Sequence, residues 1–389
     1  MANTLQFDQI SSVLNQINKI ATGQISPAAV NTKDFVAQAQ STLLSGYDNV
    51  MGAISQVLSR TIFSIRPYDR KFNGLAADSI RWGNHVRKIN YIDGEFENDD
   101  MYPLDDGESI DQYVINKPKV VQTNFYGGQR FQRHYTVFRD QLNHAFQGPD
   151  ELARFLAGVT QNVTDQRNQA WESLARNTLV NMMGAKIQGD SGNVIHLVTE
   201  YNAFAGTSLT PITVRQPENF PGFVKWLFGR LKTLSQMLTE RSVKYHINIK
   251  NEFIPRHTPI RNQRIFLYTP EINMIDSQVL ADVYNDQYLR LANHESVNFW
   301  QSIDAPDSIK VVPNYINAQG VVVNSETTTN QANVLGMIFD EEAIGLTEIF
   351  DSMDNSPYNA RGKYYNVFYH WNLRWWNDMT ENCLVLLMD

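Results

Sequence analysis

The sequence predicts an α+β fold in which one very long helix lies across a sheet. Aromatic and polar residues alternate from Tyr364 to Trp371, which is typical of a half-buried strand. The apolar run from Cys383 to Met388 predicts a second strand that is buried on both faces. Apolar positions recur at helical spacing over residues 149–183, a stretch that would span about 50 Å as a helix.

Length and composition place limits on the class of protein. The chain has 389 residues, which is enough for two or three lobes with buried cores. A net charge of -8 argues against a dedicated nucleic-acid binder. The single cysteine, Cys383, excludes an intramolecular disulfide and fits a reducing cytoplasm. We find neither a basic leader nor about 18 consecutive apolar residues, so we expect no standard export signal and no membrane span.

The first 60 residues predict two modest amphipathic helices separated by Gly23 and Pro27. Their apolar residues recur at helical spacing, and these are Phe7, Ile10, Leu14 and Ile17, then Tyr47, Val50, Ile54 and Val57. Such helices could pad a core of the same chain or form an arm that docks on a neighbouring subunit. The polar composition with narrow apolar stripes favours the arm.

A basic segment is followed directly by an acidic one. Basic residues dominate residues 60–88, and nine acidic residues with several turn formers follow within residues 93–111. The acidic spacing does not match a calcium-binding EF-hand loop, which leaves a solvated turn or the tip of a projecting hairpin. Because crowded acids repel, we expect the tip to meet a basic patch on another copy. The candidate contact residues are Asp99, Asp100, Asp105, Asp106 and Glu108 on the tip, and Arg66, Arg70, Lys71, Arg81, Arg87 and Lys88 on the basic side.

Residues 112–139 alternate in polarity and predict the returning strand of this hairpin, with Gly127 and Gly128 offering a bend. Gly148 and Pro149 then open the long helix, because proline at the first helical position costs no hydrogen bond. Gly184 is the expected end of this helix.

Residues 220–340 predict a compact α/β lobe inserted before the chain returns to the first sheet. One helix begins near Pro221, and another begins at Thr269 directly after a strand over Arg264–Tyr268. Shorter strands follow at Ile309–Pro313 and Val334–Phe339.

A search for catalytic chemistry finds no local signature. The eight histidines never fall in HExxH or paired-cysteine patterns, and GxSxG and glycine-rich phosphate loops are absent. We therefore predict no catalytic residue, metal or cofactor, although distant Asp, Glu and His residues can assemble a site without leaving a motif. Trp371, Trp375 and Trp376 could stack on sugars, but tryptophans beside strands more often belong to a core or an interface.

The C-terminal strand also carries a family resemblance. The run Arg361, Gly362, Tyr364, Asn366, Tyr369 and His370, arriving after Phe339, Asp340 and Ala343, resembles the return strand of tailed-bacteriophage major capsid proteins. The likeness is greatest to those of small podoviruses of Gram-positive hosts. The resemblance implies the tailed-phage (Hong Kong-type) capsid fold over nearly the whole chain. Its expected parts are an N-terminal arm (1–66), an extended loop and the start of the peripheral domain (67–148), a spine helix and peripheral domain (149–219), an axial domain (220–345) and peripheral return strands (346–389).

By this resemblance the chain is a structural protein of the virion that assembles in the host cytoplasm into an icosahedral shell for double-stranded DNA. The implied partners are further copies in hexamers and pentamers, scaffolding, portal and other head proteins, and DNA held by weak non-specific contact. No membrane partner is implied. Lys117 and Lys119 lie on the hairpin, but no asparagine partner can be identified, so we predict no crosslink. The alternatives are an encapsulin-type compartment shell and, from another class, a hydrolase or sugar-binding protein with an unrecognised cleft.

Overall fold

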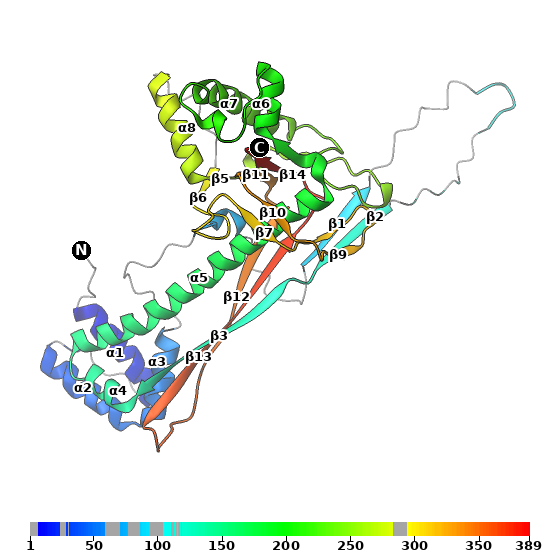
Figure 1. The fold of residues 1–389 in the computed structure, drawn as a ribbon. Helices are drawn as coiled ribbons and strands as arrows, with labels where there is room; N and C mark the ends of the chain where they lie inside the picture. Colours follow the sequence, from blue (N-terminus) through cyan, green and yellow to red (C-terminus); the bar gives the residue numbers. More distant parts are fainter. Residues whose placement is uncertain are drawn as a thin grey trace.

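The computed structural model shows two main sheets, a long helix that runs beside both, and a helical lobe at the N-terminal end (Figure 1). It describes residues 7–23, 29, 31–58, 71–76, 86–92, 104–109, 113, 115, 117, 119–282 and 294–389.

The long helix, α5 (Pro149–Gly189), has 41 residues and a length of about 60 Å. Pro149 opens it as predicted, and the acidic Asp150 and Glu151 complement the positive end of the helix dipole. The predicted end at Gly184 is wrong, because the helix continues for five more residues. A Cβ atom at Gly184 would lie 2.5 Å from Cγ1 of Val311, so this glycine serves close packing against strand β7 (Ile309–Val311).

The first sheet has three antiparallel strands in the order β12-β13-β3, formed by β12 (Ile344–Asn355), β13 (Tyr364–Asn377) and β3 (Gly128–Phe138). Strand β13 alternates as predicted and extends beyond Trp371 to Asn377. Its inner residues join the core beneath α5, and these are Tyr365, Val367, Tyr369, Trp371 and Leu373. The even-numbered residues between them are only half-buried, which leaves the other face of this sheet uncovered.

The second sheet has five strands in the order β4-β14-β11-β5-β6, which are β4 (Val194–His196), β14 (Cys383–Leu387), β11 (Val334–Asp340), β5 (Gln263–Tyr268) and β6 (His294–Val297). Strand β14 is buried throughout, as predicted. Val385 and Leu387 face one hydrophobic core, whereas Leu384 and Leu386 face the other. The sequence analysis groups this strand with the peripheral return strands, and in the structure it pairs with β4 and β11.

One face of the five-stranded sheet is covered by α6 (Leu197–Ala205), α7 (Phe220–Met237) and α8 (Thr269–Asp282), whose apolar residues form the second core (Figure 1). The helices expected near Pro221 and from Thr269 are therefore confirmed. Beside α5 lie short antiparallel pairs, in which β7 pairs with β10 (Thr329–Gln331) and β8 (Asn314–Ile316) with β9 (Val322–Asn324).

The N-terminal region contains three helices, α1 (Phe7–Thr22), α2 (Thr32–Leu44) and α3 (Tyr47–Leu58), rather than the two predicted. Helix α1 packs on α2, α3 and α5, near the short helix α4 (Arg139–Ala145). The side chain of Asn31 caps α2 by accepting a hydrogen bond of 2.9 Å from the backbone N–H of Asp34. These helices thus contribute to the core of their own subunit, and their contact with a neighbour stays a prediction.

The hairpin is formed by β1 (Val86–Ile92) and β2 (Lys119–Phe125), paired antiparallel from Val86 opposite Phe125 to Ile92 opposite Lys119. The predicted returning strand is divided at Gly127 and Gly128, beyond which β3 joins the three-stranded sheet. A Cβ atom at Gly127 would lie 2.5 Å from the carbonyl oxygen of Trp375, so the backbones approach closely there. Figure 1 shows β2 and β3 continuing almost in one line.

Candidate functional site

The root of the hairpin is fixed to the junction between the two sheets by a cluster of charges. The Lys88 ammonium on β1 lies 3.0 Å from Oδ2 of Asp378 and 3.2 Å from Oε2 of Glu342. It also pairs with Glu381, whose Oε1 lies 3.1 Å from Nη2 of Arg256. Asp378 and Glu381 belong to the short connection between β13 and β14. This cluster therefore sets where the hairpin leaves the body of the subunit.

Burial and charge act against each other in this cluster. Burial alone would lower the pKa of Lys88, but the carboxylates of Asp378 and Glu381 outweigh it, so the pKa is raised. For Glu381 burial is the largest influence and raises its pKa to about 7, although the charges of Lys88 and Arg256 lower it. The root thus contains a carboxyl group that titrates near neutral pH.

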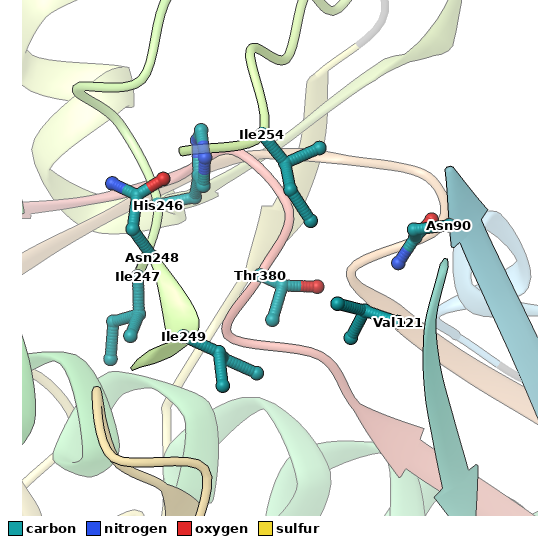
Figure 2. A pocket seen from close by; sticks show the side chains of 8 residues that line it. All are labelled: Asn90, Val121, His246, Ile247, Asn248, Ile249, Ile254 and Thr380. Atoms are coloured by element: carbon teal, nitrogen blue, oxygen red, sulfur yellow. The ribbon is translucent and has the colours of Figure 1, made fainter. Parts of the chain in front are cut away.

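A small cavity lies between the hairpin root and the α/β lobe (Figure 2). Its volume of about 10 Å³ is close to the space that one water molecule needs, so it cannot hold a substrate. Its walls come from both parts of the subunit and are Asn90, Val121, His246, Ile247, Asn248, Ile249, Ile254 and Thr380. Burial lowers the pKa of His246, whose Nδ1 lies 3.2 Å from Oδ1 of Asn382. The hairpin root and the lobe are therefore tightly fitted.

Within the described residues, no three His, Cys, Asp or Glu side chains come together as a metal site. None of the helices in the described part of the chain is both long and apolar enough to cross a membrane. Cys383 is fully buried, and burial raises the pKa of its thiol to about 12, so the thiol is not ionised at neutral pH.

The structure separates the predicted contact residues into three groups. Asp105, Asp106 and Glu108 are exposed in a turn closed by a hydrogen bond of 3.0 Å from the Glu108 N–H to the Asp105 carbonyl. Lys71 and Arg87 are also exposed, whereas Lys88 pairs within its own subunit. The remaining candidates lie outside the described residues, and these are Asp99, Asp100, Arg66, Arg70 and Arg81.

The residues that carry the family resemblance lie on β13 and in the turn before it. Gly362 is required there, because a Cβ atom would lie 2.3 Å from the Tyr364 ring. Asn366 accepts a hydrogen bond of 2.7 Å from the Thr136 hydroxyl on β3. The rings of Tyr369 and Tyr135 stack with their centres 5.8 Å apart. These contacts join β13 to β3.

Two further members of this group point away from the core. Arg361 is exposed in the turn before β13, and His370 is half-buried on the uncovered face of the sheet. Neither side chain belongs to the hydrophobic core.

Sequence reasoning missed the carboxylates that hold the hairpin root. Lys88 and Glu381 are almost 300 residues apart, so no local pattern connects them. One signal was available, because four of the five residues 378–382 are polar and yet this segment joins two strands of the core. Asp378, Thr380, Glu381 and Asn382 are all buried, and buried charges need partners.

Comparison with known proteins identifies the family. The model of the Phi29-like phage major capsid protein family matches residues 14–387. The chain belongs to this family. The Phi29-like major capsid proteins form phage shells, so this chain is a capsid shell protein and a component of the virion.

Solved structures support the same fold. In the capsid structure of Staphylococcus phage Andhra, a chain matches with a TM-score of 0.55 and 12% identity, covering 84% of this chain and 86% of that one. A chain in the structure of head fiber and inner core protein gp22 of native bacteriophage P68 matches with a TM-score of 0.52 and 14% identity, covering 85% and 87%. Among curated proteins, no match was found. The tailed-phage capsid fold predicted from the sequence is therefore confirmed.

Proposed function

We propose that this capsid protein assembles as hexamers and pentamers into an icosahedral head shell around the double-stranded DNA of a podovirus. The observation that carries the proposal is the extended hairpin, which leaves the subunit at the Lys88 cluster and presents exposed apolar residues. Ile89, Tyr91 and Val120 are 46%, 68% and 49% exposed on one face of β1 and β2. The opposite face carries the buried Asn90 and Thr123. Such an apolar face favours contact with a second subunit.

The remaining partners follow from this function. A scaffolding protein, a portal and other head proteins would complete the head, and the acidic shell would touch its DNA only weakly. Assembly would take place in the host cytoplasm. The role is structural and requires no catalytic residue or cofactor.

Negative-stain electron microscopy and sedimentation of the purified chain test the proposal directly. We expect closed shells, or rings of five and six subunits, when the chain is expressed alone or with its scaffolding protein. A uniform monomer under both conditions would count against self-assembly.

The family match favours a phage shell over an encapsulin-type compartment, and it gives no support to a hydrolase or a sugar-binding protein. The contents of particles from infected cells distinguish the first two. We expect nuclease-protected DNA inside the particles, whereas protein cargo without DNA would favour the compartment.

A further inference from the structure

The small cavity between the hairpin root and the α/β lobe has polar atoms on its walls that lack hydrogen-bond partners. Three buried atoms of lining residues have no partner among the described residues, and these are Nε2 of His246, Oδ1 of Asn248 and Nδ2 of Asn90. His246 and Asn90 are only 4% and 8% exposed. Unpaired buried polar atoms are costly and rare in folded proteins. They therefore indicate a hydrogen-bonding molecule inside the cavity.

The network behind His246 decides which ring nitrogen carries the proton. The Thr258 hydroxyl donates a hydrogen bond of 2.8 Å to Oδ2 of Asp340, so its oxygen is free to accept the bond of 3.1 Å from Nδ2 of Asn382. Oδ1 of Asn382 then lies 3.2 Å from Nδ1 of His246, and this acceptor requires a proton on Nδ1. Because burial lowers the pKa of His246, the ring holds no second proton at neutral pH. Its Nε2 is therefore a hydrogen-bond acceptor.

Asn248 presents a second acceptor to the same cavity. Its Nδ2 donates a hydrogen bond of 2.9 Å to the Val243 carbonyl, which fixes the orientation of the amide and leaves Oδ1 without a donor. The backbone of Ile254 lies near His246 and acts to raise its pKa, but it does not meet Nε2 at hydrogen-bond geometry. Figure 2 shows His246 and Asn248 on the lobe wall, opposite Asn90. Two acceptors on one wall require a molecule that donates two hydrogen bonds.

Water fits this site in both size and charge. The cavity volume of about 10 Å³ suits a water-sized molecule. A cation of similar size is disfavoured, because burial lowers the pKa of His246 and the positive charges of Arg256 and Lys186 lower it further. An anion is disfavoured because both atoms on the lobe wall are acceptors. Water is neutral, donates two hydrogen bonds and can also accept one.

We propose that the joint between the hairpin root and the α/β lobe contains ordered water that donates its hydrogens to Nε2 of His246 and Oδ1 of Asn248, while Nδ2 of Asn90 supplies a donor from the hairpin wall. The inference does not depend on shell formation, because all these groups belong to one subunit. Hydrogen bonds through water are nearly as favourable as direct ones. The water therefore adds to the contact that the Lys88 cluster makes between the hairpin root and the body of the subunit.

A crystal structure of the unassembled chain, at a resolution that reveals bound water, tests the site directly. We expect density within about 2.7–3.2 Å of both Nε2 of His246 and Oδ1 of Asn248. Other buried water in the same map is the internal control. Absence of density at this site while other buried water is seen would overturn the proposal. Density at about 2.0–2.3 Å from these atoms would indicate a metal cation and would also overturn it.

The proton on His246 provides a second test in solution. Nitrogen NMR of the chain with isotope-labelled histidine distinguishes the two neutral tautomers, and the His246 signals are assigned by their loss in His246→Gln. We expect a proton on Nδ1 and an unprotonated Nε2 whose resonance is shifted by an accepted hydrogen bond. A proton on Nε2 would overturn the proposal, because this nitrogen could not then accept a hydrogen bond from water.

A matched pair of substitutions tests whether the cavity holds the water. Val121 lines the cavity from β2, whereas its neighbour Val120 is 49% exposed on the opposite face of the strand. Val121→Ile should displace water from the cavity, so water relaxation dispersion should detect fewer long-lived water molecules than in the natural chain.

The variant Val120→Ile is the control and should match the natural chain. Equal numbers of long-lived water molecules in the two variants, with unchanged circular dichroism, would overturn the proposal. The crystal and NMR tests use the natural chain, so they remain decisive if Val121→Ile does not fold.

Discussion

The two sheets of this subunit use neighbouring parts of one C-terminal segment in opposite ways. Strand β14 is buried on both faces between two hydrophobic cores, whereas β13 is buried on one face and half-exposed on the other. The residues between them form the charge cluster that holds the hairpin. The five-stranded sheet thus stabilises the subunit, and the three-stranded sheet keeps one face available for a neighbour.

The largest expected effect comes from the doubly buried sheet. Leu384→Ala should lower the free energy of unfolding by about 2–5 kcal/mol, because it removes a fully buried side chain and leaves a cavity. Urea unfolding of the unassembled chain measures this change. Leu44→Ala is the control, since Leu44 is 88% exposed and its loss should cost under about 0.5 kcal/mol. Equal costs for the two variants would contradict the assignment of β14 to the core.

A smaller effect is expected where α5 passes close to β7. Gly184→Val should destabilise the subunit by about 1–3 kcal/mol, because the new side chain collides with Val311. Gly158→Ala in the same helix is the matched control. No atom lies within 4 Å of a Cβ at Gly158, so the alanine should stabilise the helix by up to about 1 kcal/mol. Thermal melting of both variants would reveal whether the two glycines differ in this way.

The junction between the sheets should give the chain a pH-dependent stability. The pKa of Glu381 is raised to about 7 in the folded state, whereas a glutamate in the unfolded chain has a pKa of about 4.3. Between about pH 4.3 and pH 7, the folded chain therefore keeps a proton on Glu381 that the unfolded chain has lost. This contribution to stability should therefore fall as pH rises from about 4.5 to 7, by roughly 3 kcal/mol. In Glu381→Gln it should be absent. A stability difference between the two proteins that stays constant over this pH range would refute the assignment.

The smallest effect on stability is expected on the uncovered face. His370→Ala should change the free energy of unfolding by less than about 0.5 kcal/mol, because the side chain is half-buried and packs outside the core. A stability loss of several kcal/mol would show that this face is covered within the subunit.

Strong periodic patterns made much of the fold predictable. The long helix, the alternating strand β13 and the apolar strand β14 follow from their residues alone. Helix α2 was missed because its buried residues, Phe35, Ala39 and Thr42, include only one large apolar side chain. Gly184 was taken for a helix end because its role depends on a contact with a strand about 130 residues later.

The candidate site was less predictable than the fold. The acidic tip and its need for a basic partner were visible in the sequence. The basic residues expected to contact it were chosen only because they precede the tip closely in the sequence. Lys88 is one of these residues, yet its charge is satisfied by carboxylates that only folding brings near.

The continuous line of β2 and β3 has a mechanical consequence. About 26 Å of extended chain separate Gly127 from Lys119, so a rotation of about 10° at the glycine pair would move the outer end of the hairpin by roughly 5 Å. Small changes of backbone angle at Gly127 and Gly128 are thereby converted into large displacements of the tip. A lever of this kind would let identical subunits adjust to the different curvatures around five-fold and six-fold positions.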